Sequence, residues 1–187
     1  MFNILRKDLP LQVTLKAKVY DIDYRFNNIL NILACWEDEL FPKEDRIKMM
    51  LHMFYVQDFP EEESLELFEK MVNFISLGEE VSSSSSSSPY EKIIDYEIDS
   101  WAIYSFFARV YKIDLQKEKI HWYRFVVLCQ DLDESSNLAN IVRIRTTSLN
   151  EVAKENRGKL AKLKRKFNLV KEPQTLEERN RLWLMEK

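Results

Sequence analysis

Histidine is the residue type most often used for acid–base and metal chemistry near neutral pH, and this sequence has two, His52 and His121. Neither has a second histidine or a cysteine three or four positions away, the spacing that puts two metal ligands on one helical face. Cys129 follows His121 by eight residues, about two turns or roughly 12 Å if one helix holds both, although a triad can also assemble from distant segments. We therefore expect both histidines to be core or interface residues, with no catalytic residue, metal or cofactor.

The two cysteines, Cys35 and Cys129, each lie inside an apolar stretch of the sequence. A free cysteine packs as a small hydrophobic side chain, so we expect two buried, reduced thiols. A disulfide between them is the alternative.

Acidic residues gather in three short clusters, at residues 37–39, 44–45 and 61–63. A metal-dependent hydrolase needs carboxylates that converge from several elements, whereas adjacent acids on one helix point in different directions. Phosphate-binding loops need several glycines close together, and the chain has only Gly78 and Gly158. These features favour a protein that is not an enzyme.

Charge is distributed unevenly along a chain whose net charge is −3. Residues 154–166 contain seven basic residues and one acid, a net charge of +6, so the rest of the chain carries −9. This segment is either an ordinary solvated helix face or a binding surface, for an acidic protein or for nucleic acid or another anionic surface. The chain as a whole lacks the basic field typical of nucleic-acid binders.

Periodicity predicts a mainly α fold, a helical bundle of about six to seven helices with one N-terminal β-hairpin. Polar and apolar residues alternate over residues 12–16 and 19–23, with Ala17-Lys18 as the expected turn. Helical spacing of apolar residues follows in seven segments. The predicted helices cover residues 24–40, 43–56, 60–77, 93–111, 118–132, 137–145 and 149–170. A capping-box pattern at residues 175–178 predicts a further terminal helix.

A serine tract at residues 82–88 divides the sequence into two halves. Serine competes for backbone hydrogen bonds and buries little surface, so residues 79–92 are predicted to be a flexible linker. The N-terminal half, residues 1–78, would hold the hairpin and three helices. The C-terminal half, residues 93–187, would be helical, and we expect the two halves to pack as one domain.

The aromatic side chains lie in apolar windows rather than between lysines and arginines, which favours core packing over base stacking. Four large side chains occupy the most apolar windows and are predicted to be buried: Trp101, Phe107, Trp122 and Phe125.

The segment at residues 149–170 also carries an apolar stripe with spacings of three, four and three, the geometry of a helix-to-helix seam. The stripe consists of Leu160, Leu163, Phe167 and Val170. Five cations would line its edges: Lys159, Lys162, Lys164, Arg165 and Lys166. We predict that these nine residues bind a partner helix, while packing of the stripe on the chain's own core is the alternative.

Two stretches of the sequence together resemble the "gene product fifteen" family of bacteriophages. The first runs from Asn3-Ile4-Leu5 through Leu9-Pro10, Tyr20 and Ile22 to Arg25-Phe26. The second contains Asp99, Tyr104, Phe107, Tyr111, Ile113-Asp114-Leu115, His121-Trp122, Phe125, Leu128, Leu132, Leu138, Ile141 and Ile144-Arg145. The order and spacing of these residues are similar to the family's signature over nearly the whole chain.

The resemblance implies a protein of tailed phages or prophages whose gene lies between those for the tail-tube and tape-measure proteins. It therefore implies a tail-assembly accessory protein, a chaperone-like binder of the tape-measure or another tail protein, and possible homo-oligomers. The alternatives are a structural virion component, such as a head–tail joining protein, and, less favoured, a nucleic-acid binder that uses the basic segment. No run of about 18 apolar residues occurs, so we expect no membrane partner and a location in the bacterial host cytoplasm during phage assembly.

Overall fold

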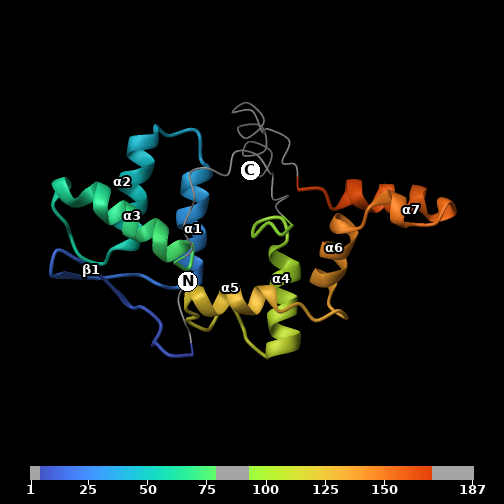
Figure 1. Cartoon of the computed structure of the whole chain (residues 1–187), viewed down its shortest axis with the longest axis horizontal. Coiled ribbons are helices and arrows are strands. Elements are labelled where there is room, and N and C mark those ends of the chain that lie inside the picture. The colour runs from blue at the N-terminus through green and yellow to red at the C-terminus, as the bar shows by residue number, and fades with distance from the viewer. Residues whose placement is uncertain (1–4, 79–92, 170–187) are drawn as a thin grey trace, which may run out of the picture. The chain divides into compact units, whose positions relative to one another are not determined.

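A computed structural model describes residues 5–78 and 93–169, which form a mainly α-helical fold with one N-terminal hairpin. The chain divides into two compact units (Figure 1). The first comprises Met1–Ser88 and Tyr104–Leu132, and the second comprises Pro89–Ile103 and Asp133–Lys187. The C-terminal half therefore contributes a central part of the first unit, while the expectation that the two halves pack as a single domain stays a prediction.

The hairpin pairs β1 (Gln12–Leu15) with β2 (Lys18–Asp21) in antiparallel register, with Leu15 opposite Lys18. Its turn residues are Lys16 and Ala17, with φ of 46° and 66°. The predicted turn, Ala17-Lys18, was wrong by one residue. A two-residue turn matches the twist of the strands when both central residues have positive φ. Asparagine, aspartate and glycine usually mark such a turn in a sequence, and Lys16 and Ala17 are none of these.

Three helices follow the hairpin in the first unit: α1 (Phe26–Glu37), α2 (Lys43–Phe54) and α3 (Ser64–Ile75), the last preceded by the single-turn helix η1 (Glu61–Glu63). α2 packs against both α1 and α3. Glu63 accepts hydrogen bonds from Lys18 and Tyr20, and Glu66 pairs with Lys16, so these contacts hold the hairpin on the start of α3. α3 ends as predicted near Gly78, whose φ of 75° suits glycine.

The helix predicted over residues 93–111 begins later than expected, as α4 (Ser100–Phe106), and continues as a π-helical turn, η2 (Phe107–Tyr111). The carboxylate of Asp95 accepts hydrogen bonds from the backbone N–H groups of Glu97 and Ile98, at 2.9 Å each. These bonds close a turn at residues 96–99, and the α-helix begins only after it, at Ser100. The prediction was therefore wrong at the N-terminal end of this helix.

The core of the first unit forms around α5 (Trp122–Gln130), which packs against α1. The ring of Phe125 stacks on Phe26 at 4.6 Å and on Phe107 at 5.3 Å between centroids. The predicted burial of Phe107, Trp122 and Phe125 is confirmed.

The predicted burial of Trp101 was wrong, because 84% of this side chain is exposed. The buried side chains of α4 are Ala102, Ile103 and Phe106, which share the opposite side of the helix. An apolar window therefore identifies a helix, but only tertiary packing decides which of its faces is covered.

The second unit contains α6 (Asn137–Thr146), the short helix η3 (Leu149–Glu151) and α7 (Lys154–Lys166) (Figure 1). Ser136 caps α6 by accepting from Ala139 N, and Ser148 forms a capping box with Glu151. Three apolar residues of α6 are buried and form the core of this unit: Leu138, Ile141 and Ile144.

The predicted linker at residues 79–92 and the predicted terminal helix beyond residue 175 lie outside the described residues. Among the helices of residues 5–78 and 93–169, none is both long enough and apolar enough to cross a bilayer.

Candidate functional site

The predicted partner-binding stripe lies on α7, where the structure places three of its four apolar residues at half-buried positions. Leu160, Leu163 and Phe167 are partly covered, and no residue of α7 is fully buried. α7 packs on α6 and on η3, so part of the stripe contacts its own unit. Val170 lies outside the described residues.

The five predicted cations do not act as one group. Lys159, Lys162, Arg165 and Lys166 are exposed, and their spacing places them on one side of the helix. We call these four residues the α7 basic face. Lys164 is half-buried instead, and its Nζ donates a hydrogen bond to the carbonyl oxygen of Arg145 at 2.6 Å. It therefore attaches α7 to the end of α6.

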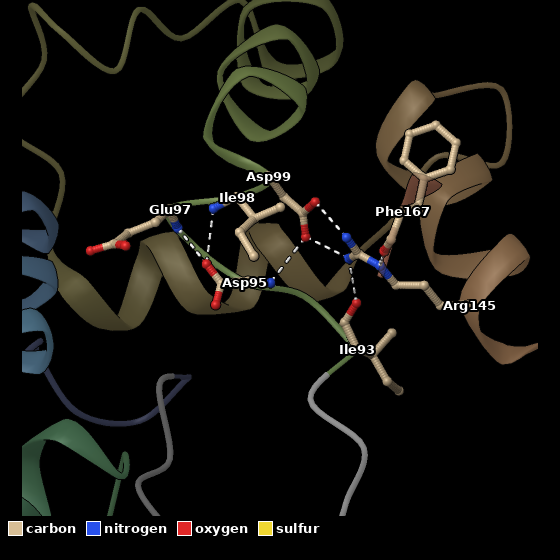
Figure 2. A network of polar contacts seen from close by, with 7 residues as sticks. All are labelled: Ile93, Asp95, Glu97, Ile98, Asp99, Arg145 and Phe167. Carbon is tan, nitrogen blue, oxygen red and sulfur yellow. Dashed lines mark hydrogen bonds and ion pairs between the residues drawn. The ribbon is translucent and has the colours of Figure 1, made fainter. Parts of the chain in front are cut away.

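Arg145 is the residue that fixes α7, and Figure 2 shows its guanidinium facing the carboxylate of Asp99. Nη1 and Nη2 of Arg145 donate to Asp99 Oδ2 and Oδ1 at 2.6 and 2.8 Å, a bidentate ion pair. Nε donates to the carbonyl of Phe167 at 2.6 Å, and Nη1 also donates to the carbonyl of Ile93 at 2.8 Å. One side chain thus joins α6, the end of α7 and the segment before α4.

Both charges of this pair are removed from water, because only 9% of the Arg145 side chain and 3% of the Asp99 side chain are exposed. Asp99 Oδ2 also accepts from the backbone N–H of Asp95 at 3.0 Å. A buried pair is tolerated when further hydrogen bonds satisfy its remaining groups, and this one has them on both sides. The pair therefore helps to hold α7, and with it the α7 basic face, in a fixed position on the second unit.

Sequence reasoning missed the role of Asp99 and Arg145. Both residues belong to the family-like signature, but 46 positions separate them, and no periodicity links residues at that distance. Neither residue stands out in its own window, because Asp95 and Glu97 lie close to Asp99 and Arg143 lies close to Arg145.

The two stretches that carry the family resemblance meet at His121. Its Nε2 lies 3.0 Å from the carbonyl oxygen of Pro10, and its Nδ1 accepts from the backbone N–H of Tyr123 at 3.0 Å. The ring is therefore a neutral tautomer with the proton on Nε2. Its Nδ1 caps the N-terminus of α5. Burial lowers the pKa of His121. The prediction of a core histidine with satisfied ring nitrogens is confirmed for this residue.

We expect His121 to make the first unit sensitive to mild acid. Because its pKa is lower in the folded chain than in the unfolded chain, unfolding takes up a proton as the pH falls, so the free energy of unfolding decreases. His121→Asn keeps a capping acceptor but cannot titrate. Thermal unfolding between about pH 7.5 and 5.5 should show a smaller loss of stability with pH for this variant than for wild type. A slope in His121→Asn equal to that of wild type would contradict the assignment.

The two cysteines are free thiols, as predicted, although only Cys129 is buried and Cys35 is half-buried. Burial raises the pKa of Cys129 to about 12, so this thiol stays protonated at neutral pH and is a poor nucleophile. Within the described part of the chain, no three His, Cys, Asp or Glu side chains are grouped closely enough to hold a metal ion.

Comparison with known families identifies a related family. The model of the family described as Bacteriophage Gp15 protein matches residues 5–169. No curated protein and no solved structure matches the chain. The match spans both compact units, from the hairpin to the end of α7, and includes the residues that His121 and Arg145 bring together. This chain belongs to the Bacteriophage Gp15 protein family.

Proposed function

We propose that the protein is a phage tail-assembly accessory protein that binds the tape-measure protein as a chaperone and has no catalytic activity of its own. Membership of a bacteriophage family supports a structural or assembly role in the phage. The resemblance noted in the sequence adds the tail region and the neighbouring tape-measure gene, and so supports the choice of partner.

The observation that supports the proposal most directly is that α7 is held in place with its basic face exposed to solvent. The α7 basic face is exposed, while Leu160, Leu163 and Phe167 lie half-buried along the adjacent side of the helix. Arg145 and Lys164 hold the C-terminal part of α7 in place. A fixed helix with a basic face and a partly accessible apolar edge suits an amphipathic helix with acidic flanks.

A tape-measure protein is a long helical chain whose apolar stripes are exposed until the tail tube encloses it. A chaperone for such a chain must offer apolar contact and must release its client later. Surface cations accelerate encounter with an acidic helix more than they tighten the complex. The α7 basic face would therefore contribute mostly to the rate of binding, which suits a transient complex.

Charge reversal on α7 tests this proposal. Lys162→Glu with Lys166→Glu should slow association with the tape-measure protein of the same phage by about tenfold or more at low salt, because it turns attraction into repulsion. Surface plasmon resonance with the co-expressed tape-measure protein measures this rate. Both positions are exposed, so the fold should persist by circular dichroism, whereas Asp substitutions at Leu163 and Phe167 would also disturb the packing of α7.

The matched control is Arg143→Glu with Lys154→Glu, which changes the net charge equally at two exposed sites of the same unit. It should retain most of the wild-type rate. Equal slowing by both pairs would show that the association rate depends on net charge and not on the α7 basic face. If the wild-type protein does not bind the tape-measure protein, the proposed partner is wrong. Stoichiometric retention of the protein in purified particles would favour the structural virion role instead. Steep, salt-dependent retention on DNA would favour nucleic-acid binding.

A further inference from the structure

We propose that the corner between α1 and α2 is a docking surface for the α7 basic face of a second copy of this chain. The corner consists of residues 36–45, at the end of α1 and the start of α2. It combines exposed apolar side chains with acidic ones. The corner itself is separate from α7, but the α7 basic face that docks on it is the surface also assigned to the tape-measure protein, so one α7 cannot make both contacts at once.

The apolar part of the corner is formed by three large side chains that remain exposed in the structure. Trp36 is 40% exposed, Leu40 is 53% exposed and Phe41 is 48% exposed. The three lie within six consecutive residues, and a turn closed by the hydrogen bond from Phe41 N to Asp38 O, at 3.4 Å, holds Leu40 and Phe41 beside the helix end. Neighbouring exposed apolar residues on one surface typically mark an interaction site.

The charge around these side chains is negative. Residues 36–45 contain five acids and one base, Lys43. Three of the acids follow one another at the C-terminal end of α1, which has no basic residue in its last turn. Acids at the negative end of a helix dipole are unfavourable for the helix itself, so a cation from outside would be stabilised there.

Two cations of the chain lie at this corner, each close to the indole ring of Trp36. Lys43 Nζ and the guanidinium carbon of Arg46 lie 5.9 and 5.7 Å from the centre of the Trp36 ring. Arg46 also donates to the carbonyl oxygen of Trp36. The corner as a whole stays acidic, and Glu39 and Glu44 remain exposed at its edge.

The α7 basic face complements both properties of the corner. Its side chains have long aliphatic stems that can cover Leu40 and Phe41 while their charged ends reach Glu39 and Glu44. The face is the most basic part of the sequence, since residues 154–166 carry a net +6. Each chain therefore carries two complementary surfaces, the acidic and apolar corner and the α7 basic face, through which two copies can bind.

Sedimentation of the full chain across a concentration and salt series tests the proposal. Wild type should self-associate reversibly, and added salt should weaken the association. Glu39→Lys with Glu44→Lys should weaken it by about tenfold or more, and so should Lys162→Glu with Lys166→Glu. The control pair, Asp58→Lys with Glu69→Lys, adds the same charge to exposed sites elsewhere in the first unit and should associate like wild type.

A charge-swap experiment gives the sharper test. A mixture of the two reversed variants restores opposite charges across the contact, and so does a chain that carries all four substitutions, so both should associate again. If a reversed corner perturbs α2, Leu40→Ser with Phe41→Ser weakens the contact through its apolar part. A wild-type chain that stays monomeric, or reversed-corner variants that associate like wild type, would overturn the proposal. The corner variants leave α7 intact, so tape-measure binding can be scored separately.

Discussion

Asp99→Ala should destabilise the second unit by about 3–5 kcal/mol, because it leaves the buried guanidinium of Arg145 without its counter-charge. The carboxylate accepts two hydrogen bonds from Arg145 and one from the backbone N–H of Asp95 (Figure 2). Hydrogen–deuterium exchange with peptide resolution should show loss of protection over residues 133–169, and urea unfolding should give the free energy.

Two variants test the origin of this loss. Glu134→Ala removes an exposed acid next to α6 and should change the free energy of unfolding by less than about 0.5 kcal/mol. Arg145→Lys keeps the positive charge, but an ammonium group cannot donate to Asp99, Ile93 and Phe167 in the geometry of the planar guanidinium. This variant should therefore also be destabilising. If Asp99→Ala behaves like Glu134→Ala, the ion pair does not hold α7 in place.

Phe125→Ala should cost about 3–5 kcal/mol of the stability of the first unit, because the cavity it leaves cannot close fully. Phe125 is fully buried and stacks on Phe26, Phe107 and Trp122. It also lies where α5 meets α1. Urea unfolding followed by tryptophan fluorescence measures the change, since Trp122 is in contact with the site.

Val127→Ala is the matched control for Phe125→Ala, because Val127 is on the same helix and exposed. It should shift the unfolding midpoint only slightly. Phe125→Leu should fall between the two, since it retains most of the apolar volume. A Phe125→Ala variant as stable as Val127→Ala would mean that α5 does not form the core of this unit.

Helix positions were predictable from the sequence because they depend on local periodicity and on breakers. Prolines and Gly78 bound the first three helices close to the predicted residues, and α6 begins after its serine cap. The hairpin turn was misplaced because its positive φ angles fall on Lys16 and Ala17. The long helix expected from Ile93 begins only at Ser100, because the side chain of Asp95 closes a turn before it.

The sequence by itself determined that this is a mainly α phage-family protein with a basic helix near residues 154–166, because periodicity, charge and motif order are properties of the chain. Only the tertiary structure decided which groups of that helix face the solvent and what holds it. Lys164 turned inward to the end of α6, and Trp101 turned outward from α4. The pairing of Asp99 with Arg145 likewise required folding, because contacts between distant residues depend on how the helices pack, and packing has no local signal in the sequence.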